Sequence, residues 1–250
     1  MEGIGRRKDY NTYEMSVADG LIGYGIGSIG AFALFYIFYS SWIIGAIAAI
    51  PAGFLGLRLW KDHRIRKQKE QLLLQFKDFL EALSASYSAG NNTLTALTDS
   101  AEDLARLHGD SEYMVQELRD MLLAYRNGQG IENSFHDLAE RSGLEDIRSF
   151  ADVFDTCNRK GADMRRIIQD TRRVITEKIE MEQGIRTLLA PGRSELRTMM
   201  VLPVLMILIM NGGGLIPESS AGTNLVIKII AMAVFGVAYL IGRKITNIRI

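Results

Sequence analysis

Cysteine, histidine and proline are all scarce in this sequence, which has one Cys, three His and four Pro in 250 residues. The single cysteine, Cys157, excludes an intramolecular disulfide framework and any CxxC-type metal or redox motif. The histidines lie far apart, and none has a second His, Cys or Asp at metal-ligand spacing. We therefore expect no metal site and interpret them as solvated or supporting side chains; they are His63, His108 and His136.

The sequence also lacks the common signatures of catalysis. It has no GxxxxGK[ST] loop, so we expect no binding of ATP in the P-loop manner. Gly128 and Gly130 resemble a phosphate loop only in composition, because they follow a predicted helix and not a strand. GxSxG is absent, and Cys157 has no histidine nearby in the sequence. We expect a protein that is not an enzyme, with no catalytic residues and no cofactor.

Charged residues are missing from two long stretches of the chain. Gly20 to Leu57 contains no Asp, Glu, Lys or Arg. The stretch from Thr198 to the last residue is almost as poor in charge, whereas the segment between the two stretches is rich in charge of both signs. A water-soluble segment thus lies between two lipid-soluble ones. The few charges after Thr198 are Glu218, Lys228, Arg243, Lys244 and Arg249.

The two apolar stretches are each long enough for a pair of membrane spans. The first would extend roughly 57 Å as one helix, about twice the thickness of the hydrocarbon core, so we expect two spans that turn near Ser40 and Ser41. The second stretch is expected to supply a third span from Met199 to about Leu215 and a fourth over residues 224–241. Lys228 lies near an end of the fourth span, where it can snorkel to the headgroups.

Four spans place both termini and the charged segment on one side of the membrane. Basic residues gather on that side, notably from Arg58 to Lys69, so the positive-inside rule makes it the cytoplasm. We expect a multi-pass protein of the cell (inner, cytoplasmic) membrane that contacts the lipid bilayer and no nucleic acid. Its expected parts are a cytoplasmic N-terminal segment (1–19), a first transmembrane hairpin (20–57), a cytoplasmic domain (58–197), a second hairpin (198–242) and a cytoplasmic tail (243–250).

Small residues recur at four-residue spacing in the first hairpin, at Gly23 and Gly27 and again at Gly45 and Gly53. Such spacing lets helices approach closely. The hairpin packing against itself and a specific oligomer interface both account for the pattern.

The central domain reads as six helices, because apolar residues recur every three or four positions and no alternating run appears. The predicted helices cover about 63–89, a segment capped by Asn92 or Thr93, a segment after Asp110, then 131–141, 144–159 and 163–189. Turns are expected at Gly90, Gly128 and Gly161 and again at Gly192, Arg193 and Pro203, and Pro191-Gly192 is expected to break the last helix. The predicted fold class is an all-α integral membrane protein, with two transmembrane helical hairpins flanking a six-helix cytoplasmic bundle. Expected core residues include Leu72, Phe76, Phe79, Leu83, Met114, Leu118 and Tyr125.

The part of this domain farthest from the membrane is strongly acidic. This surface is either ordinary solvated protein or a docking face for a basic cytoplasmic partner, since charge steers such encounters. The candidate docking residues are Asp99, Glu102, Asp103 and Glu112.

The order of several short motifs resembles the F-domain family of type II secretion systems, in the single-domain form of Tad/Flp pilus platform proteins (TadB/TadC-like). The resemblance covers about Lys67 to Pro203 and the flanking spans. The motifs are Ser88-Ala89-Gly90, Leu94-x-Ala96-Leu97, Gly128-x-x-Ile131-x-x-Ser134-Phe135, Leu138-Ala139-Glu140-Arg141, Lys160-Gly161, and Arg186-Thr187 through Gly192-Arg193 to Pro203.

This resemblance implies a platform in the inner membrane of a Tad or type IV pilus or type II secretion machine. Such a platform couples a hexameric secretion ATPase to the assembly of pilin subunits, and a single F-domain implies a second copy or a sister platform protein. The alternatives are a membrane-anchored helical scaffold or signalling protein and a small transporter. Both expected external loops are short and no paired charges fall at mid-bilayer depth, which places these alternatives behind the platform.

Overall fold

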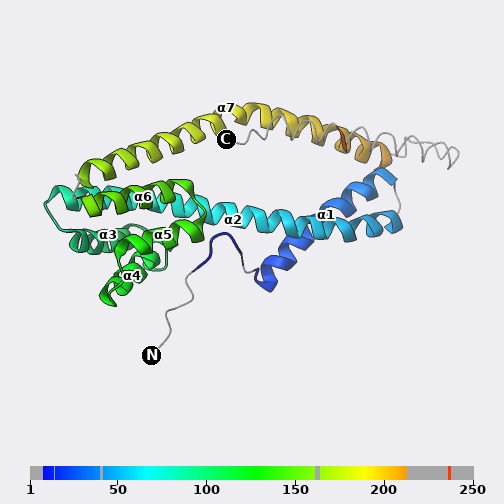
Figure 1. Cartoon of the computed structure of the whole chain (residues 1–250). Coiled ribbons are helices and arrows are strands. Elements are labelled where there is room, and N and C mark those ends of the chain that lie inside the picture. The colour runs from blue at the N-terminus through cyan, green and yellow to red at the C-terminus, as the bar shows by residue number, and fades with distance from the viewer. Residues whose placement is uncertain (1–7, 14, 40–41, 161–163, 213–235, 238–250) are drawn as a thin grey trace. The chain divides into compact units, whose positions relative to one another are not determined.

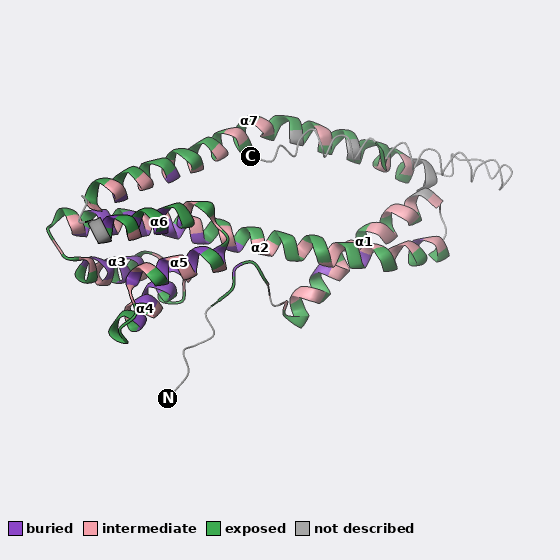
Figure 2. Cartoon of the chain, in the orientation of Figure 1, coloured by how far each residue is buried: buried purple, intermediate pink, exposed green. Residues whose placement is uncertain are grey.

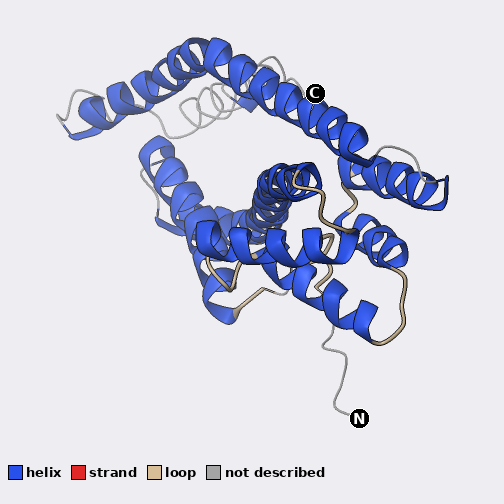
Figure 3. Cartoon of the chain, turned by 90° about the vertical axis from the view of Figure 1, so that its left-hand side faces the viewer, coloured by secondary structure: helices blue, strands red, loops and turns tan. Residues whose placement is uncertain are grey.

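The computed structural model describes residues 8–13, 15–39, 42–160, 164–212 and 236–237 of the chain. These residues form helices joined by loops and include no strand, which confirms the all-helical prediction (Figures 1 and 3). The helices are α1 (Val17–Tyr39), α2 (Trp42–Ser88), α3 (Thr93–His108), α4 (Tyr113–Arg126), α5 (Ile131–Ser142), α6 (Glu145–Lys160) and α7 (Met164–Gly212).

The chain divides into two compact units. One, called here the helical domain, contains Met1–Glu14 and Asp62–Glu180; the other, the hairpin unit, contains Met15–Lys61 and Met181–Ile250. Helices α2 and α7 each begin in one unit and end in the other. The expected limits at residues 58 and 197 refer to a membrane surface and stay predictions.

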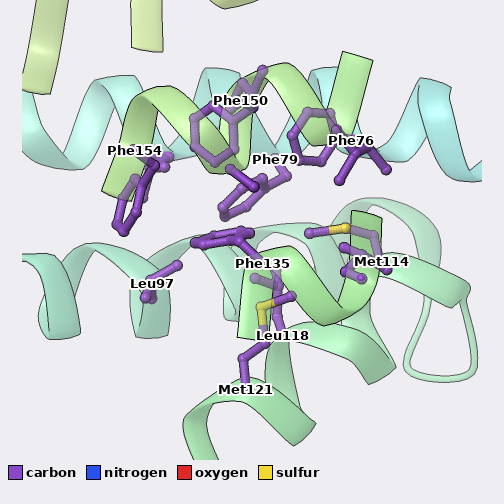
Figure 4. Close-up of a cluster of buried hydrophobic side chains, with 14 of the residues drawn as sticks. Phe76, Phe79, Leu97, Met114, Leu118, Met121, Phe135, Phe150 and Phe154 are labelled. Atoms are coloured by element: carbon purple, nitrogen blue, oxygen red, sulfur yellow. The ribbon is translucent and has the colours of Figure 1, made fainter. Parts of the chain in front are cut away.

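The core of the helical domain is a cluster of phenylalanines from three helices. Phe135 of α5 packs against Phe150 and Phe154 of α6, with ring centroids 5.2 and 5.0 Å apart, and against Phe79 of α2 at 6.0 Å. Figure 4 shows these rings between the helices, and each is at most 1% exposed. Buried residues are concentrated in α3 to α6 and in the part of α2 within this domain (Figure 2).

Helices α3 and α4 bury most of the faces that their apolar spacing predicts, and the exceptions are Leu94 and Tyr125. Leu97 and Leu104 of α3 are buried, as are Met114 and Leu118 of α4. Tyr125 was expected in the core but is 42% exposed. It lies in the last turn of α4, where the small side chain of Ala124 takes the buried position instead.

Most helix ends of this domain follow the capping signals in the sequence. The Asn92 side chain accepts a hydrogen bond of 2.9 Å from the backbone N–H of Thr95 and so caps α3. Gly90 and Gly128 have φ of 89° and 84°, a conformation that favours glycine, which fits the predicted turns. The turn expected at Gly161 lies outside the described residues.

Helix α7 corrects one group of predictions. It runs without interruption from Met164 to Gly212, with Pro191 and Pro203 inside it. Gly192, Arg193 and Pro203 therefore lie in a helix and not in turns. One proline removes one backbone hydrogen bond, whereas ending a helix leaves up to four carbonyls without partners, and an apolar environment makes those carbonyls costly.

Helix α2 is also longer than predicted. The expected second span and the expected first helix of the central domain form one helix of 47 residues. The basic run from Arg58 to Lys69, which separates them in composition, continues the same helical backbone because Lys and Arg are good helix formers.

Two helices in the described part of the chain are long and apolar enough to cross a membrane: Val17–Ile37, within α1, and α2. Their outer apolar side chains are exposed, as at Leu21 (69%) and Ile47 (66%), which suits a lipid environment. The third expected span falls at the end of α7, where apolar residues such as Leu205 are exposed. The fourth, over residues 224–241, lies almost entirely outside the described residues.

Candidate functional site

The most elaborate polar site in the helical domain lies where the N-terminal segment docks on α4 and α5. We call residues 8–13 the N-terminal strap. Tyr10 is 1% exposed, and its hydroxyl donates a hydrogen bond of 3.0 Å to Oε1 of Glu117 on α4. Glu117 is itself 4% exposed. A buried carboxylate requires a partner, because removing its charge from water is costly.

That partner is Arg141, in the last turn of α5. Its Nη1 donates to Glu117 Oε1 at 2.7 Å and its Nη2 to Oε2 at 2.6 Å, while its Nε donates to Asp137 Oδ2 at 2.9 Å. The parallel pair of hydrogen bonds fixes both position and orientation, which a lysine in this place would not do. Nη1 of Arg141 also donates to the backbone carbonyl of Lys8, at 2.8 Å.

The strap also completes the C-terminal end of α5. The backbone N–H of Tyr10 donates to the Arg141 carbonyl at 3.0 Å. The Asn11 side chain donates to the carbonyls of Glu140 and Arg141, at 3.3 and 3.1 Å. Carbonyls in the last turn of a helix have no partner within the helix, so these contacts satisfy groups that would otherwise need water. The Lys69 ammonium on α2 donates to Asn11 Oδ1 at 2.6 Å.

Aromatic contacts hold the strap on α4. The rings of Tyr10 and Tyr113 meet edge to face, with centroids 5.6 Å apart. The Lys8 ammonium lies over the Tyr113 ring at 4.3 Å from its centroid, within the range of a cation–π contact. Within the strap, the side chain of Asp9 accepts a hydrogen bond from the backbone N–H of Asn11, an Asx turn that presets the strap's shape.

This environment shifts both titratable partners. Burial, together with the negative charge and hydrogen bond of Glu117, raises the pKa of Tyr10 well above its usual value. Burial by itself would lower the pKa of Arg141, but the hydrogen bonds and charges of Glu117 and Asp137 outweigh it and raise that pKa. At neutral pH the site therefore holds a neutral phenol and a fixed cation.

No local sequence pattern predicts the docking of the strap at this site. Apolar residues do not recur at a regular spacing in the strap, and Tyr10 is 107 positions from Glu117 in the sequence. Glu117 lies three residues after Met114 and four before Met121, so the spacing of α4 places it on the buried face, although its charge by itself favours a surface position.

The four predicted docking acids lie in two different settings. Asp99 accepts hydrogen bonds from the side chains of Ser86 and Asn91, at 2.8 and 3.0 Å. Glu112 accepts one from Gln75, at 2.6 Å. These two acids hold helix ends and loops of their own chain.

The other two acids face solvent on α3. The side chains of Glu102 and Asp103 are 65% and 60% exposed. Each lies 3.6 Å from Arg106 of the same helix, and such exposed pairs contribute about 0.5 kcal/mol or less. Both remain accessible to a partner.

The predicted packing glycines lie between α1 and α2. A Cβ atom at Gly27 would lie 2.5 Å from the Ala52 carbonyl oxygen, and one at Gly45 would lie 3.1 Å from the Phe32 ring. A Cβ at Gly23 would lie 3.0 Å from that of Trp60, and one at Gly53 would overlap the side chains of Tyr24 and Ser28. These contacts are within one chain, so they account for the glycines without an oligomer.

No group of three or more His, Cys, Asp or Glu side chains able to hold a metal ion occurs among the described residues. His108 pairs with Asp78 at 2.9 Å, and His136 lies 3.7 Å from Asp152. His63 is exposed. The histidines thus lie on different helices, each away from the others.

The fold and this arrangement define a class: an all-helical membrane protein in which two long helices join a compact helical domain to apolar segments. A sequence model for type II secretion system (T2SS), protein F, matches residues 79–212, more than half of the chain. The chain therefore belongs to this family, which confirms the resemblance of its motifs. It is a membrane platform protein of machinery of the type II secretion or pilus kind. Comparisons with curated proteins and with solved structures gave no match.

Proposed function

We propose that this chain is the cytoplasmic-membrane platform of a Tad pilus, type IV pilus or type II secretion machine. In this role it couples a hexameric cytoplasmic secretion ATPase to the assembly of pilin subunits, with no catalysis of its own. The match of residues 79–212 to the protein F family carries this proposal. Since the match comprises one domain, the chain acts with a second copy or a sister protein.

Two continuous helices support the mechanical part of the proposal. Helices α2 and α7 have 47 and 49 residues, which corresponds to about 70 Å each at 1.5 Å per residue. Each contains part of the helical domain and an apolar segment. Between their prolines, which are Pro51 in α2 and Pro191 and Pro203 in α7, these helices resist bending through their backbone hydrogen bonds, so a displacement of the helical domain is transmitted along them.

The N-terminal strap supports the topology. Residues 8–13 bond to α4 and α5 of the helical domain, so both lie on the same side of any bilayer. The chain must then cross an even number of times between residues 14 and 62, as α1 and the first part of α2 would as two spans. The basic run Arg58–Lys69 makes that side the cytoplasm. Four spans in all, with both termini inside, complete the proposal.

The solvent-facing acids of α3 are the proposed contact for the ATPase. Glu102 and Asp103 present two adjacent negative charges, and each pairs with Arg106 of the same helix. Charge of this kind steers a basic partner to its binding site.

The test is a charge reversal of these two residues in the full-length chain. We expect Glu102→Lys with Asp103→Lys to weaken binding of the secretion ATPase at least tenfold in a pull-down from detergent extracts, and to reduce pilus assembly. Asp99 and Glu112 are left unchanged because their side chains hold the fold. Circular dichroism of the purified variant checks that its helices are intact.

The matched control reverses two exposed acids on another helix, Glu177→Lys with Glu180→Lys on α7. It changes the net charge by the same amount and should leave ATPase binding within twofold. Equal loss in both variants would reduce the effect to net charge, and no loss in either would remove α3 as the contact.

A further inference from the structure

The N-terminal strap joins the helical domain to α1 through residues 14–16, in addition to the connection through α2. We propose that the strap is a releasable clip: when docked on α4 and α5 it ties the start of α1 directly to the helical domain, and when released it leaves α1 joined to that domain through α2 alone. This inference deepens the proposed coupling function and rests on its membrane hairpin.

The strap docks through specific contacts of its side chains and does not lie loosely on the surface of the domain. Tyr10 places a ring against Tyr113 and a hydroxyl on Glu117. Asn11 reaches the last carbonyls of α5. Three helices, α2, α4 and α5, each contribute partners to the strap. Its docking therefore depends on the relative positions of these helices.

The same site is built to survive without the strap. If Tyr10 leaves, Glu117 keeps both hydrogen bonds from Arg141, and Arg141 keeps Asp137. No buried charge is abandoned, which would be the costly outcome. The carbonyls that accept hydrogen bonds from Asn11 lie at the end of α5, and both hydrogen bonds are exposed to solvent. Water can therefore replace the Asn11 amide there. Release therefore costs the burial of the Tyr10 ring, which is part of the core cluster, and the contacts of the strap, whereas the ion pairs of Arg141 are kept.

The connection from the strap to α1 is short. Residues 14–16 are all that separate Tyr13 from Val17, the first residue of α1. Because only three residues link the strap to α1, a docked strap limits how far the start of α1 can move when α4 and α5 move. Coupling through the strap can be switched, whereas coupling through the continuous helix α2 cannot.

Hydrogen–deuterium exchange on the full-length protein in lipid nanodiscs tests the clip. In the unaltered chain we expect the strap amides to exchange at least tenfold more slowly than an unstructured peptide of the same sequence, because the Tyr10 N–H is bonded to Arg141. Tyr10→Ala should abolish this protection and speed exchange in the first turn of α1 at least threefold. Exchange in α2, α5 and α6 should change less than twofold.

The control is Tyr125→Ala, the same change at an exposed position of α4, which should leave the strap and α1 protected. Three results would each overturn the clip: a strap that is unprotected in the unaltered chain, a loss of protection throughout α4 to α6 in Tyr10→Ala, or an α1 that does not respond when the strap is freed. None of these measurements involves the ATPase, so failure of the docking test on α3 is distinguishable from failure of the clip.

Discussion

Glu117 of α4 and Arg141 of α5 form a two-pronged ion pair, with N–O distances of 2.7 and 2.6 Å and side chains only 5% and 14% exposed. The pair joins two helices that are adjacent in sequence but connected by a loop. Nε of Arg141 also donates a hydrogen bond to Asp137 on the same helix, and this bond helps to orient the guanidinium toward Glu117. The Tyr10 hydroxyl donates its hydrogen bond to the Glu117 carboxylate that this cation holds in place.

Removing one partner of this pair should destabilise the helical domain strongly. Arg141→Met leaves Glu117 buried without its cation, and we expect a loss of about 3–5 kcal/mol in the free energy of unfolding. Thermal unfolding of the full-length protein in one detergent, followed by circular dichroism, measures the change. The matched control is Arg119→Met, whose pair with Asp110 is exposed and should contribute less than about 1 kcal/mol.

The double variant Glu117→Gln with Arg141→Met separates the pair itself from the cost of an orphaned charge. It should be more stable than Arg141→Met alone, since no buried charge remains. A double variant that is no more stable than Arg141→Met would contradict this account.

Phe135 should be the most sensitive position of the core. Its ring meets Phe79, Phe150 and Phe154, so Phe135→Ala opens a cavity among side chains that cannot collapse together, at a cost of about 3–5 kcal/mol. The same unfolding experiment checks it. Leu123→Ala on α4, at a position 55% exposed, should stay within about 0.5 kcal/mol of the parent; similar losses at both positions would disprove the assigned core.

Gly27 and Gly25 lie two residues apart on α1 and should respond in opposite directions. A Cβ at Gly27 would lie 2.5 Å from the Ala52 carbonyl oxygen, whereas a Cβ at Gly25 meets nothing within 4 Å. We expect Gly27→Ala to lose about 1–3 kcal/mol through overpacking. Gly25→Ala should be neutral or gain up to about 1 kcal/mol, since alanine is the better helix former. Thermal unfolding in detergent distinguishes them, and equal effects would place the α1–α2 contact elsewhere.

The phenol of Tyr10 should ionise well above the range of an exposed tyrosine. Burial and Glu117 raise its pKa in the docked strap, while the undocked phenol ionises near pH 10. Docking is therefore fully favourable below about pH 10, and it weakens as the pH rises beyond that value, because only the undocked form then loses its proton. Tyr113 and Arg141 also act on this phenol, and the positive charge of Arg141 opposes part of the rise in its pKa.

Absorbance at the tyrosinate band measures this directly. The difference between the titrations of the parent chain and Tyr10→Phe isolates one tyrosine, which should ionise clearly above pH 10. A difference curve centred near pH 10 would mean that the strap is not docked.

The fold class followed from local patterns. Apolar spacing predicted most of the buried faces of α3 and α4, and Asn92, Gly90 and Gly128 marked helix ends, because caps and turns depend on a few neighbouring residues. Local rules failed at Pro191, where helix ending competes with the cost of unpaired carbonyls in an apolar segment. They also failed at the basic run of α2, where a change in composition was not a change in backbone.

The candidate functional residues were also predictable only in part. The exposure of Glu102 and Asp103 was readable from the helical pattern of α3, but the hydrogen bonds that engage Asp99 and Glu112 were not. The amino-acid sequence by itself determined that the chain is helical, apolar in two stretches and a member of the protein F family. Only the tertiary structure decided that Tyr10 closes over Glu117 and Arg141, because partners more than a hundred positions apart meet through packing, and no local pattern encodes that meeting.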